Sequence, residues 1–448
     1  MTDDTLHILY QNHIVGELIL HSGGELEIRF DDAYRGNPHA VPLSTKMPLE
    51  SPSHRGIAVE NWLWGLLPDD PNVLEKWRVD FGVRERNPFG LLGSPIGEDC
   101  PGAFSFVRPE RMDAFVARPN QTDWLSDTEM ATLIRNLRAD ATDWLGTDPA
   151  GRFSLAGAQS KTALLWNGKK WGRPWGTTAT THIVKPAIKG LDSHDLNEHL
   201  CLSAARNAGI DAVKTEIHSF EDQTALFVQR YDRAEIEGQQ VRLHQEDMCQ
   251  ALGLHPVMKY QERGGPSPKA IANLLRIVMP STRSAEAVQK FLDALVWNWL
   301  LCATDAHGKN YSLFIGSNDV ELAPLYDISS TLPYDYKKRE IKLAMKFGSG
   351  YGVDIRPSVW KVLASDLGMS EEMVRTRARG IVEKANDAFA MAANTDSVRR
   401  LKSSLPGLMV DRVATRVASC MMALDATPPI PSPDTTRTQN TGFKDDSL

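Results

Sequence analysis

The sequence predicts an α+β fold whose first half is rich in strands and whose second half is mostly helical. Residues 6–30 alternate short apolar runs with turn residues, which is typical of an antiparallel meander. Further β-prone runs, such as residues 181–186, recur between residues 150 and 240. From residue 245 onward, apolar side chains mostly follow the i, i+3, i+4, i+7 spacing of buried helices. A chain of 448 residues is long enough for two or three such domains.

Bulk composition indicates a globular protein, with 42% hydrophobic and 24% charged residues. The net charge of −7 argues against a chain that binds nucleic acid over its whole surface. The five cysteines include no CxxC pair, which favours reduced thiols over disulfides or a zinc site. The acidic N-terminus lacks the order of a signal peptide, and no uncharged run is long enough to span a bilayer. We therefore expect a cytoplasmic protein without a membrane partner.

The N-terminal unit carries no catalytic constellation of its own. Residues 59–67 (VENWLWGLL) follow the meander with helical spacing, and Pro68 ends that helix. The pair Trp62 and Trp64 indicates packing in a core or at a domain interface rather than a ligand site.

A loop of small residues at positions 153–166 lies between two strand-like ends. Small side chains let the backbone approach phosphates, and successive N–H groups can form an anion nest. The loop is not a Walker A motif, because GxxxxGK[ST] is absent. Upstream of it, residues 127–138 predict one helix in an otherwise polar connecting segment.

A lysine near the end of a β-rich run is a candidate phosphate ligand. Lys185 follows residues 181–184, and protein kinases aim such a strand lysine at the α- and β-phosphates of ATP. Glu198, in a helix that begins near Asn197, could pair with it. Taken alone, the pattern also describes an exposed lysine at a strand edge. Residues 225–233 are apolar and then polar, which predicts a strand that leads into a hinge between two lobes.

Residues 303–310 (ATDAHGKN) have the layout of a protein-kinase catalytic loop. Asp305 is followed five residues later by Asn310, between an apolar helix and a strand-like run. In such a loop the aspartate takes the proton of a substrate hydroxyl, and the asparagine holds Mg²⁺ on the nucleotide phosphates. Asp327, in the apolar run of residues 325–328, suits the other metal ligand because Mg²⁺ prefers oxygen. The spacing alone also fits an aspartate that caps an ordinary turn.

The remaining C-terminal sequence is predicted to be helical and then disordered. Apolar residues between 288 and 300 trace a buried helix that runs into the Asp305 loop. Residues 358–424 predict two more amphipathic helices. The tail from residue 426 is rich in Pro, Thr, Ser and Asp, which indicates disorder.

Taken together, these motifs resemble the HipA toxins of bacterial HipBA toxin–antitoxin systems, which have a eukaryotic-protein-kinase-like fold. The N-terminal unit is also similar to the small β-rich domain of full-length members, notably at residues 65–71 (GLLPDDP) and 89–107. The matching stretches occur in family order, at residues 154–162 (SLAGAQSKT), 181–185 (THIVK), 197–198 (NE), 229–233 (QRYDR), 245–250 (QEDMCQ), 304–310 (TDAHGKN) and 324–328 (PLYDI).

The resemblance implies a bilobal, kinase-like α+β fold with an N-terminal β-rich subdomain and a mostly helical C-terminal lobe. The expected units are an N-terminal subdomain (residues 1–108), a connecting segment (109–150), a kinase N-lobe (151–240), a helical C-lobe with the catalytic loop (241–425) and a disordered tail (426–448).

Carried over residue by residue, the resemblance implies that Asp305 is the catalytic base and that Asn310 and Asp327 hold Mg²⁺. ATP is the implied nucleotide, with Lys185 on its phosphates and its adenine at the hinge. The residues expected to bind the nucleotide or lie beside it are Ala156, Gly157, Ala158, Gln159, Ser160, Lys161, Lys185, Gln229, Arg230, Tyr231, Gln245, His307, Gly308, Lys309, Asn310 and Asp327.

Family members autophosphorylate a serine at the start of the Gly-rich loop, which expels the loop and switches the kinase off. Ser154 stands at that position, and a phosphoserine would add close to two negative charges where ATP phosphates must bind. Ser160 stands where some relatives have Glu and offers a second hydroxyl, so the choice between the two serines stays open. Gln229 replaces the glutamate typical of this hinge, and backbone contacts to adenine should survive that change.

The resemblance implies a serine/threonine protein kinase that acts as a toxin. Its implied substrate is an aminoacyl-tRNA synthetase, glutamate–tRNA ligase first, whose phosphorylation causes growth arrest or persistence. The implied partner is a HipB-like helix-turn-helix antitoxin, through which the toxin reaches operator DNA. An alternative is a nucleotide-binding co-repressor that works mainly with the antitoxin on DNA, and a small-molecule kinase is a third reading. The intact catalytic and metal-binding set favours the enzyme over the co-repressor.

Overall fold

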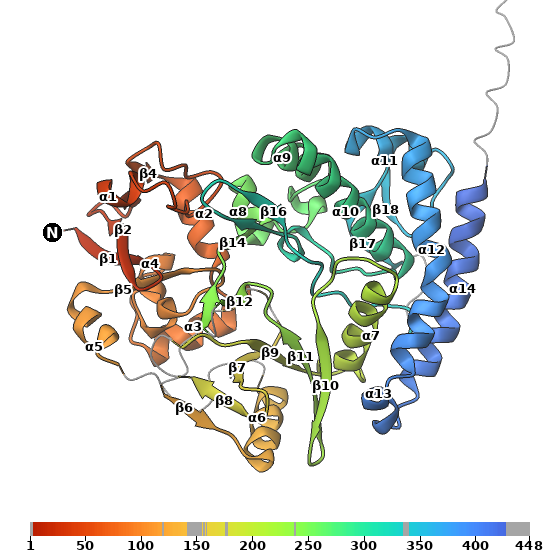
Figure 1. The fold of residues 1–448 in the computed structure, drawn as a ribbon, viewed down its shortest axis with the longest axis horizontal. Coiled ribbons are helices and arrows are strands. Elements are labelled where there is room, and N and C mark those ends of the chain that lie inside the picture. Colours follow the sequence, from red (N-terminus) through yellow and green to blue (C-terminus); the bar gives the residue numbers. More distant parts are fainter. Residues whose placement is uncertain are drawn as a thin grey trace, which may run out of the picture.

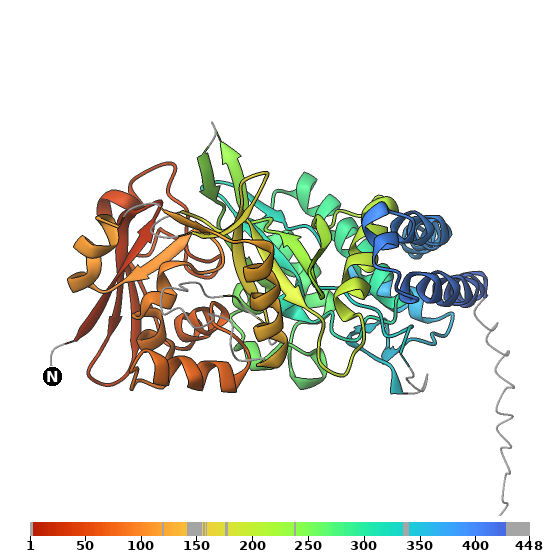
Figure 2. The ribbon, with the colours of Figure 1, turned by 90° about the horizontal axis from the view of Figure 1, so that it is seen from below.

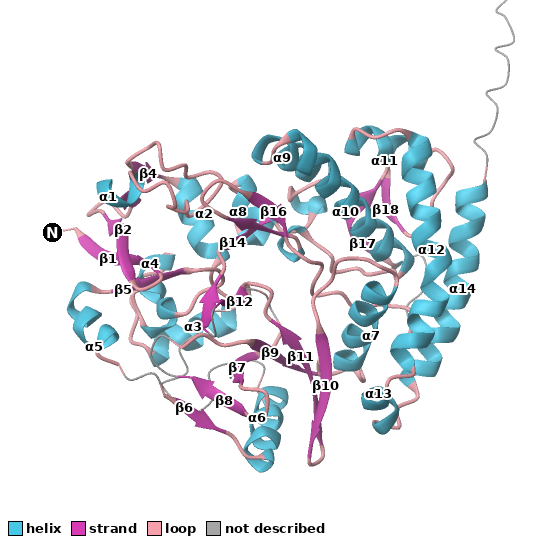
Figure 3. Cartoon of the chain, in the orientation of Figure 1, coloured by secondary structure: helices cyan, strands magenta, loops and turns pink. Residues whose placement is uncertain are grey.

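The chain is elongated, with a β-rich unit at one end, stacked helices at the other and a second sheet between them (Figures 1 and 2). The computed structural model describes residues 3–118, 121–140, 155, 157, 159–174, 178–236, 239–334 and 340–426. Colouring by secondary structure shows how helices gather toward the C-terminal end (Figure 3), which confirms the predicted α+β class. In these residues, no helix combines the length and apolar character that a membrane crossing requires. Most of the tail predicted to be disordered, residues 427–448, lies outside the described part.

The N-terminal unit is built on an antiparallel sheet in the order β4-β3-β2-β1-β5. The predicted meander is confirmed, because β1, β2 and β3 pair in sequence, with Leu6 opposite Leu18 and Leu18 opposite Ile28. All three side chains are fully buried and face the helices of the unit. The strands are β1 (Asp4–Tyr10), β2 (His13–Leu20), β3 (Leu26–Phe30), β4 (Ser53–Arg55) and β5 (Phe104–Val107). The helices are α1 (Asp32–Arg35), α2 (Ile57–Gly65), α3 (Pro71–Asp80), α4 (Pro88–Leu92) and α5 (Met112–Val116), with 3-10 turns at Pro95–Glu98 and Pro109–Arg111.

A six-stranded sheet in the order β10-β11-β9-β7-β8-β6 forms the middle of the molecule. Successive residues of β11 point to opposite faces. Accordingly, Phe227 packs with helix α6 whereas Leu226 and Val228 pack with helix α7. The strands are β6 (Thr122–Trp124), β7 (Thr162–Trp166), β8 (Trp171–Pro174), β9 (His182–Pro186), β10 (Thr215–Phe220) and β11 (Gln223–Gln229), and the helices are α6 (Asp127–Ala139) and α7 (His194–Asn207).

Helix α6 matches the helix predicted within the connecting segment. Ser126 caps it, since the Ser126 hydroxyl accepts from the Glu129 backbone N–H while the Glu129 carboxylate accepts from the Ser126 N–H. Strand β6 of the same segment pairs with β8. The segment thus contributes both a strand and a covering helix to the second sheet.

The C-terminal half is mostly helical, with short strands near the predicted catalytic loop. Helix α10 includes the predicted stripe of residues 288–300 and is almost fully buried over its last three turns. Four helices rather than two occupy residues 358–424, because Gly368 ends one helix in a left-handed conformation and a loop follows Ala393. The helices are α8 (Met248–Leu252), α9 (Pro268–Val278), α10 (Ser281–Leu300), α11 (Val359–Leu367), α12 (Glu371–Ala393), α13 (Asp396–Arg400) and α14 (Leu405–Asp425). The strands are β12 (Arg233–Ile236), β13 (Gln239–Arg242), β14 (Gln245–Asp247), β15 (Ser312–Ile315), β16 (Val320–Leu322), β17 (Lys342–Phe347) and β18 (Gly350–Gly352), with 3-10 turns at Pro256–Met258, Gln261–Arg263 and Gly308–Asn310.

The N-terminal unit docks on the C-terminal half through buried polar contacts. Trp62 is 1% exposed, and its indole N–H donates to the Glu246 carboxylate at 3.1 Å. Thr45 donates to the same carboxylate through its backbone N–H and its hydroxyl. The Gln250 side-chain amide donates to the Trp62 carbonyl. Trp62 is therefore an interface residue, as the sequence predicts.

Candidate active site

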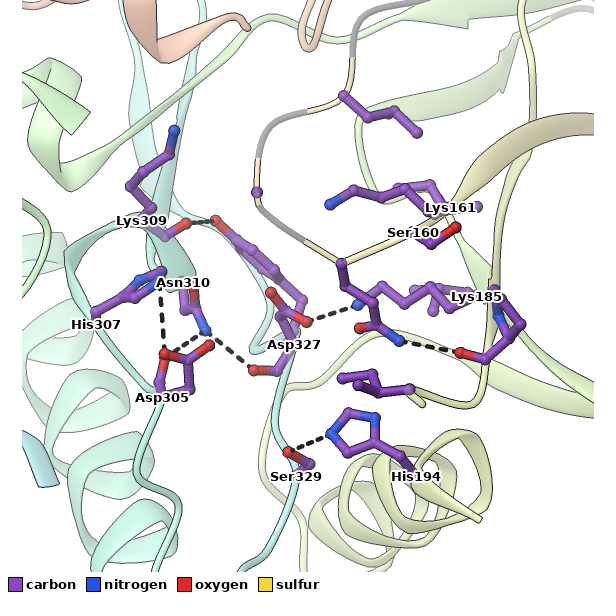
Figure 4. Close-up of a pocket in the computed structure, with 18 of the residues that line it drawn as sticks. Ser160, Lys161, Lys185, His194, Asp305, His307, Lys309, Asn310, Asp327 and Ser329 are labelled. Carbon is purple, nitrogen blue, oxygen red and sulfur yellow. Dashed lines mark hydrogen bonds and ion pairs between the residues drawn. The ribbon is translucent and has the colours of Figure 1, made fainter. Parts of the chain in front are cut away.

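A cavity of about 580 Å³ lies between the six-stranded sheet and the helical half. Strand β9, the end of β11 and the first turn of α7 line one side, and residues 304–310 line the other. The close-up in Figure 4 shows Lys161 and Lys185 on the sheet side, Asp305 and Asn310 on the opposite side, and Asp327 between them. The predicted site residues that the structure describes thus come together mostly around one cavity.

The segment that carries Asp305 and Asn310 is held by a sharp turn of the backbone and by the Asn310 side chain. Helix α10 ends at Leu300, and Cys302 then adopts a left-handed conformation that turns the chain out of the helix. The Asn310 amide nitrogen donates to the backbone carbonyls of Asp305 at 3.0 Å and Asp327 at 3.1 Å. One asparagine side chain therefore ties both predicted carboxylate positions together.

Lys185 is buried between two carboxylates. Its ammonium lies 2.8 Å from Glu198 Oε1 and 2.6 Å from Asp327 Oδ1. Burial opposes the charged form, but Asp327 and Glu198 raise the pKa of Lys185, so the ammonium stays protonated. For Asp327 burial likewise opposes ionisation, and Lys185 and Lys161 lower its pKa. The strand lysine and helix glutamate thus form the predicted pair.

Asp327 also has an unusual backbone. Its φ is 58°, a left-handed conformation that costs energy for a residue with a side chain. The preceding Tyr326 anchors the chain here, because its hydroxyl donates to the Lys309 carbonyl at 2.6 Å. In this backbone conformation the Asp327 carboxylate points toward Lys185 and the cavity.

Tyr260 contacts the predicted catalytic carboxylate. Its hydroxyl donates to Asp305 Oδ1, and its ring packs edge-on against His307, with centroids 5.1 Å apart. Desolvation in the cleft and then the negative charge of Asp327 raise the pKa of Asp305, whereas the Tyr260 hydrogen bond lowers it. His307 Nε2 lies 3.9 Å from Asp305 Oδ1, too far for a hydrogen bond, and burial lowers the pKa of His307 to about 3. The Asp305 carboxyl therefore has a raised basicity and one fixed oxygen.

Asp69 of the N-terminal unit reaches the catalytic segment. Its two carboxylate oxygens lie 2.6 Å from the Lys309 ammonium and 2.9 Å from the Lys259 ammonium. Burial opposes ionisation of Asp69, but Lys309 and Lys259 lower its pKa to about 2. Asp69, Lys259 and Tyr260 were not among the predicted site residues. The GLLPDDP stretch is the one available signal for Asp69, and from sequence alone it indicates a helix stop and a point of resemblance.

The described part of the small-residue loop also faces the cavity. Gly157 has a φ of 104°, and a Cβ there would come within 2.7 Å of the Lys161 ammonium, so this position requires glycine. Lys161 is 5% exposed, and burial followed by the charge of Lys185 lowers its pKa to about 8. The Gln159 side-chain amide donates to the Pro186 carbonyl at 3.2 Å, and the Ser160 hydroxyl donates to the Leu137 carbonyl at 2.8 Å. Ser154, Ala156 and Ala158 of the prediction lie outside the described residues.

The hinge residues reach the cavity in different ways. The Arg230 guanidinium is buried against the Thr180 hydroxyl and Asp232, and the Asp232 carboxylate also accepts from the Gly102 N–H of the N-terminal unit. Tyr231 stacks on Tyr326 with ring centroids 5.3 Å apart, and its hydroxyl donates to the Gln245 side chain. Gln229, Arg230, Tyr231 and Gln245 all line the cavity.

Gly308 is not among the residues that line the cavity, although its neighbours His307 and Lys309 are. A Cβ there would come within 2.6 Å of Pro266 and 3.1 Å of the Cys249 sulfur. Its N–H donates to the Lys259 carbonyl at 3.0 Å. Close packing therefore accounts for this glycine, and its predicted place beside the nucleotide stays a prediction.

The donor set fits a small divalent cation bound together with phosphates. The Asn310 amide nitrogen is used in two hydrogen bonds, which leaves the amide oxygen to accept from or coordinate a ligand. Asp327 engages Lys185 through Oδ1, which leaves Oδ2. Within the described residues no cluster of three His, Cys, Asp or Glu side chains could hold a metal unaided. Mg²⁺ is bound in this way by one or two side-chain oxygens plus substrate phosphates.

Comparison with known proteins identifies related chains. The family model of the HipA N-terminal domain matches residues 6–107, and that of the HipA-like C-terminal domain matches residues 153–389. Y4mE of Sinorhizobium fredii, a candidate kinase, is 32% identical over 419 residues, which cover 93% of this chain and 98% of that protein. The serine/threonine-protein kinase toxin HipA of Shewanella oneidensis is 30% identical over 317 residues, 68% of this chain and 70% of that protein. A solved structure of Shewanella oneidensis HipA with HipB and operator DNA has a TM-score of 0.77 at 24% identity and covers 94% of this chain and 100% of that chain. That structure has the same fold.

Proposed function

The chain belongs to the HipA family, and from this premise we propose that it is an ATP-dependent serine/threonine protein kinase. The observation that carries the proposal is the arrangement of Asp305, Asn310 and Asp327 opposite the Lys185–Glu198 pair, around a cavity large enough for a nucleotide. Phosphoryl transfer requires little covalent chemistry from the protein, so positioning and charge account for most of the catalysis. This cavity supplies both.

In the proposed reaction Asp305 accepts the proton of a substrate hydroxyl. The hydroxyl oxygen forms a bond to the γ-phosphorus of ATP, and the bond from that phosphorus to the β–γ bridging oxygen breaks, so that ADP leaves with the electron pair. The raised pKa of Asp305 makes it a better base than an aspartate of ordinary pKa. The Asp305 side chain is 65% exposed, which leaves room for the acceptor hydroxyl to approach.

Three groups on the chain are proposed to hold the nucleotide. Lys185 and Lys161 carry positive charge into the part of the cavity next to Asp327. Asn310 and Asp327 would hold Mg²⁺, which neutralises phosphate charge when bound. The backbone of residues 229–231 would bind adenine through one donor and one acceptor.

We further assign the activity to a toxin, as the name of the Shewanella oneidensis relative states for that protein. The proposed substrate is a translation component in the cytoplasm, an aminoacyl-tRNA synthetase such as glutamate–tRNA ligase, whose phosphorylation would arrest growth and produce persistence. The proposed partner is a HipB-like helix-turn-helix antitoxin, since the related solved structure contains HipB and operator DNA. Autophosphorylation is proposed at Ser154, with Ser160 as the alternative.

The proposal is tested by the intact mass of the purified protein before and after incubation with Mg·ATP, followed by peptide mapping. Protein that is already phosphorylated is first treated with a phosphatase. We expect a phosphate on a serine of residues 154–160 in the wild type and none in Asp305→Asn, which should still bind ATP. Transfer that persists in Asp305→Asn would remove Asp305 from its role. If no phosphate reaches either the chain or a synthetase substrate, the co-repressor function is favoured instead.

A further inference from the structure

An aspartate from outside the kinase lobes connects three parts of the candidate active site. Asp69 follows helix α2 and precedes helix α3 of the N-terminal unit. Its carboxylate joins the ammonium groups of Lys309 and Lys259, and its backbone N–H donates to the Gly157 carbonyl at 3.0 Å. The small-residue loop and the catalytic segment are therefore both attached to one residue of the N-terminal unit.

Both lysines are tied to the catalytic segment through their backbones. The Lys259 carbonyl accepts from the Gly308 N–H, and the Lys309 carbonyl accepts from the Tyr326 hydroxyl. Lys309 directly precedes Asn310, whose side chain holds the Asp305 and Asp327 carbonyls. An anion that fixes the two lysine side chains therefore also restricts the backbone between Asp305 and Asn310.

The geometry at Asp69 is rigid. Pro68 and Pro71 flank the pair Asp69–Asp70, and each proline fixes its own φ angle. Pro68 forms an isolated parallel bridge with Gly157. The Lys309 side chain is 3% exposed and that of Asp69 is 10% exposed, so little water is available to replace the ion pair if it is lost.

We propose that Asp69 is a positioning residue for phosphoryl transfer, through which the N-terminal unit holds the catalytic segment in its productive conformation. The inference rests on the proposed kinase function. Asp69 does not line the cavity and acts through Lys309 and Lys259, which do. It should therefore affect the transfer step more than the binding of ATP, whose phosphates and adenine have their own ligands on the sheet and the hinge.

The chain offers a matched control in the adjacent residue. Asp69→Asn removes the carboxylate charge and keeps the backbone bond to Gly157. Asp70→Asn makes the same chemical change one residue later, where the Asp70 side chain caps helix α3 by accepting from the Asn72 N–H. Asparagine is an equally good cap, so this control should fold and act like the wild type.

The test measures initial rates of ³²P transfer from Mg·[γ-³²P]ATP to the protein itself, together with ATP affinity by calorimetry. For Asp69→Asn we expect kcat to fall at least tenfold, while the Kd for ATP changes less than threefold. Asp70→Asn should stay within twofold of the wild type in both. In a Lys309→Met background, Asp69→Asn should lower kcat less than threefold further. A normal kcat in Asp69→Asn, a change confined to Kd, or full additivity with Lys309→Met would overturn the proposal.

Hydrogen exchange supplies a readout that needs no activity. Peptides that cover residues 305–310 should exchange faster in Asp69→Asn than in Asp70→Asn, and unchanged exchange would count against the inference. If the wild type transfers no phosphate, the proposed function fails, whereas faster exchange in Asp69→Asn would still support the positioning contact. If Asp69→Asn does not fold, Asp69→Glu replaces it. A kcat of Asp69→Glu within tenfold of the wild type then supports the need for a carboxylate charge at this position. An Asp69→Glu variant that folds but transfers no phosphate overturns the proposal.

Discussion

Replacement of Tyr260 by phenylalanine removes a single hydroxyl from the candidate active site. In the described part of the chain, that hydroxyl is the one side-chain group hydrogen-bonded to the Asp305 carboxylate. His307 is too distant to replace it, and Asn310 binds the Asp305 backbone rather than the carboxylate. Without Tyr260, the Asp305 carboxylate is free to rotate.

The size of the effect follows from the type of bond. A hydrogen bond to a charged group contributes about 1.5–3 kcal/mol. If that energy serves to orient Asp305 in the transition state, its loss lowers kcat by roughly 10–100-fold. The Tyr260 hydrogen bond also lowers the pKa of Asp305, so its removal raises that pKa. Because a base must be ionised to accept a proton, the acidic limb of the pH–kcat profile should move to higher pH.

The assay is the pH dependence of ³²P transfer from Mg·[γ-³²P]ATP at saturating ATP. Tyr351→Phe is the control, because Tyr351 lies on the nearby hairpin β17–β18 and its ring contacts the Lys346 ammonium rather than Asp305. We expect this control to match the wild type. An unchanged kcat and an unchanged acidic limb in Tyr260→Phe would refute the idea that Tyr260 orients the catalytic base.

Three further predictions concern buried charges. Glu198→Gln removes one of the two carboxylates that contact Lys185, and it should lower kcat/KM for ATP by about 10–100-fold. Steady-state kinetics measures this change, and the control Asp195→Asn on the same helix should have a much smaller effect. Burial and the charge of Lys185 lower the pKa of Lys161 to about 8. Bound phosphates should raise that pKa, so ATP binding at a pH above 8 should be accompanied by uptake of a proton. Calorimetry in buffers of different ionisation enthalpy detects this uptake, and Lys161→Arg should abolish it. Burial raises the pKa of Glu246 from 4.5 to about 7, so its stabilising contribution is complete below pH 4.5 and is lost as the pH rises through 7. Glu246→Gln should therefore gain stability relative to the wild type by about 3 kcal/mol between pH 4.5 and pH 8, measured by urea unfolding; a pH-independent difference would refute the burial argument.

Local sequence signals were sufficient for the elements that position the site. The meander, helix α6 and strand β9 are confirmed because each has a complete periodic or turn pattern within its own segment. Asp305 and Asn310 could be predicted together because the spacing within one short loop fixes their relation, whereas Asp327 was predicted from the separate apolar run of residues 325–328. The structure places them around one cavity, and their chemical roles stay predictions.

The residues that sequence reasoning missed make long-range contacts. Tyr260 lies 45 residues before Asp305, and Asp69 lies 240 residues before Lys309. Neither separation produces a periodicity, and a turn that contains proline and aspartate predicts a helix stop equally well. The number of C-terminal helices was underestimated for a different reason. The break near residue 394 contains neither proline nor glycine, so the strongest stop signals are absent there, whereas Gly368 was a stop signal that the prediction of two helices did not use.

The contacts of the N-terminal unit indicate that it is part of the catalytic fold. Glu246 would lose its Thr45 and Trp62 donors if the unit were removed, and Lys309 would lose Asp69. Removal of the unit would also expose these groups to water. The loss in the free energy of unfolding would therefore be smaller than the roughly 3–5 kcal/mol that follows when an ion pair is broken inside a protein. The large helical core does not depend on the unit. We therefore expect the kinase lobes alone to keep most of their helices, while the segment from Asp305 to Asn310 loses its fixed geometry.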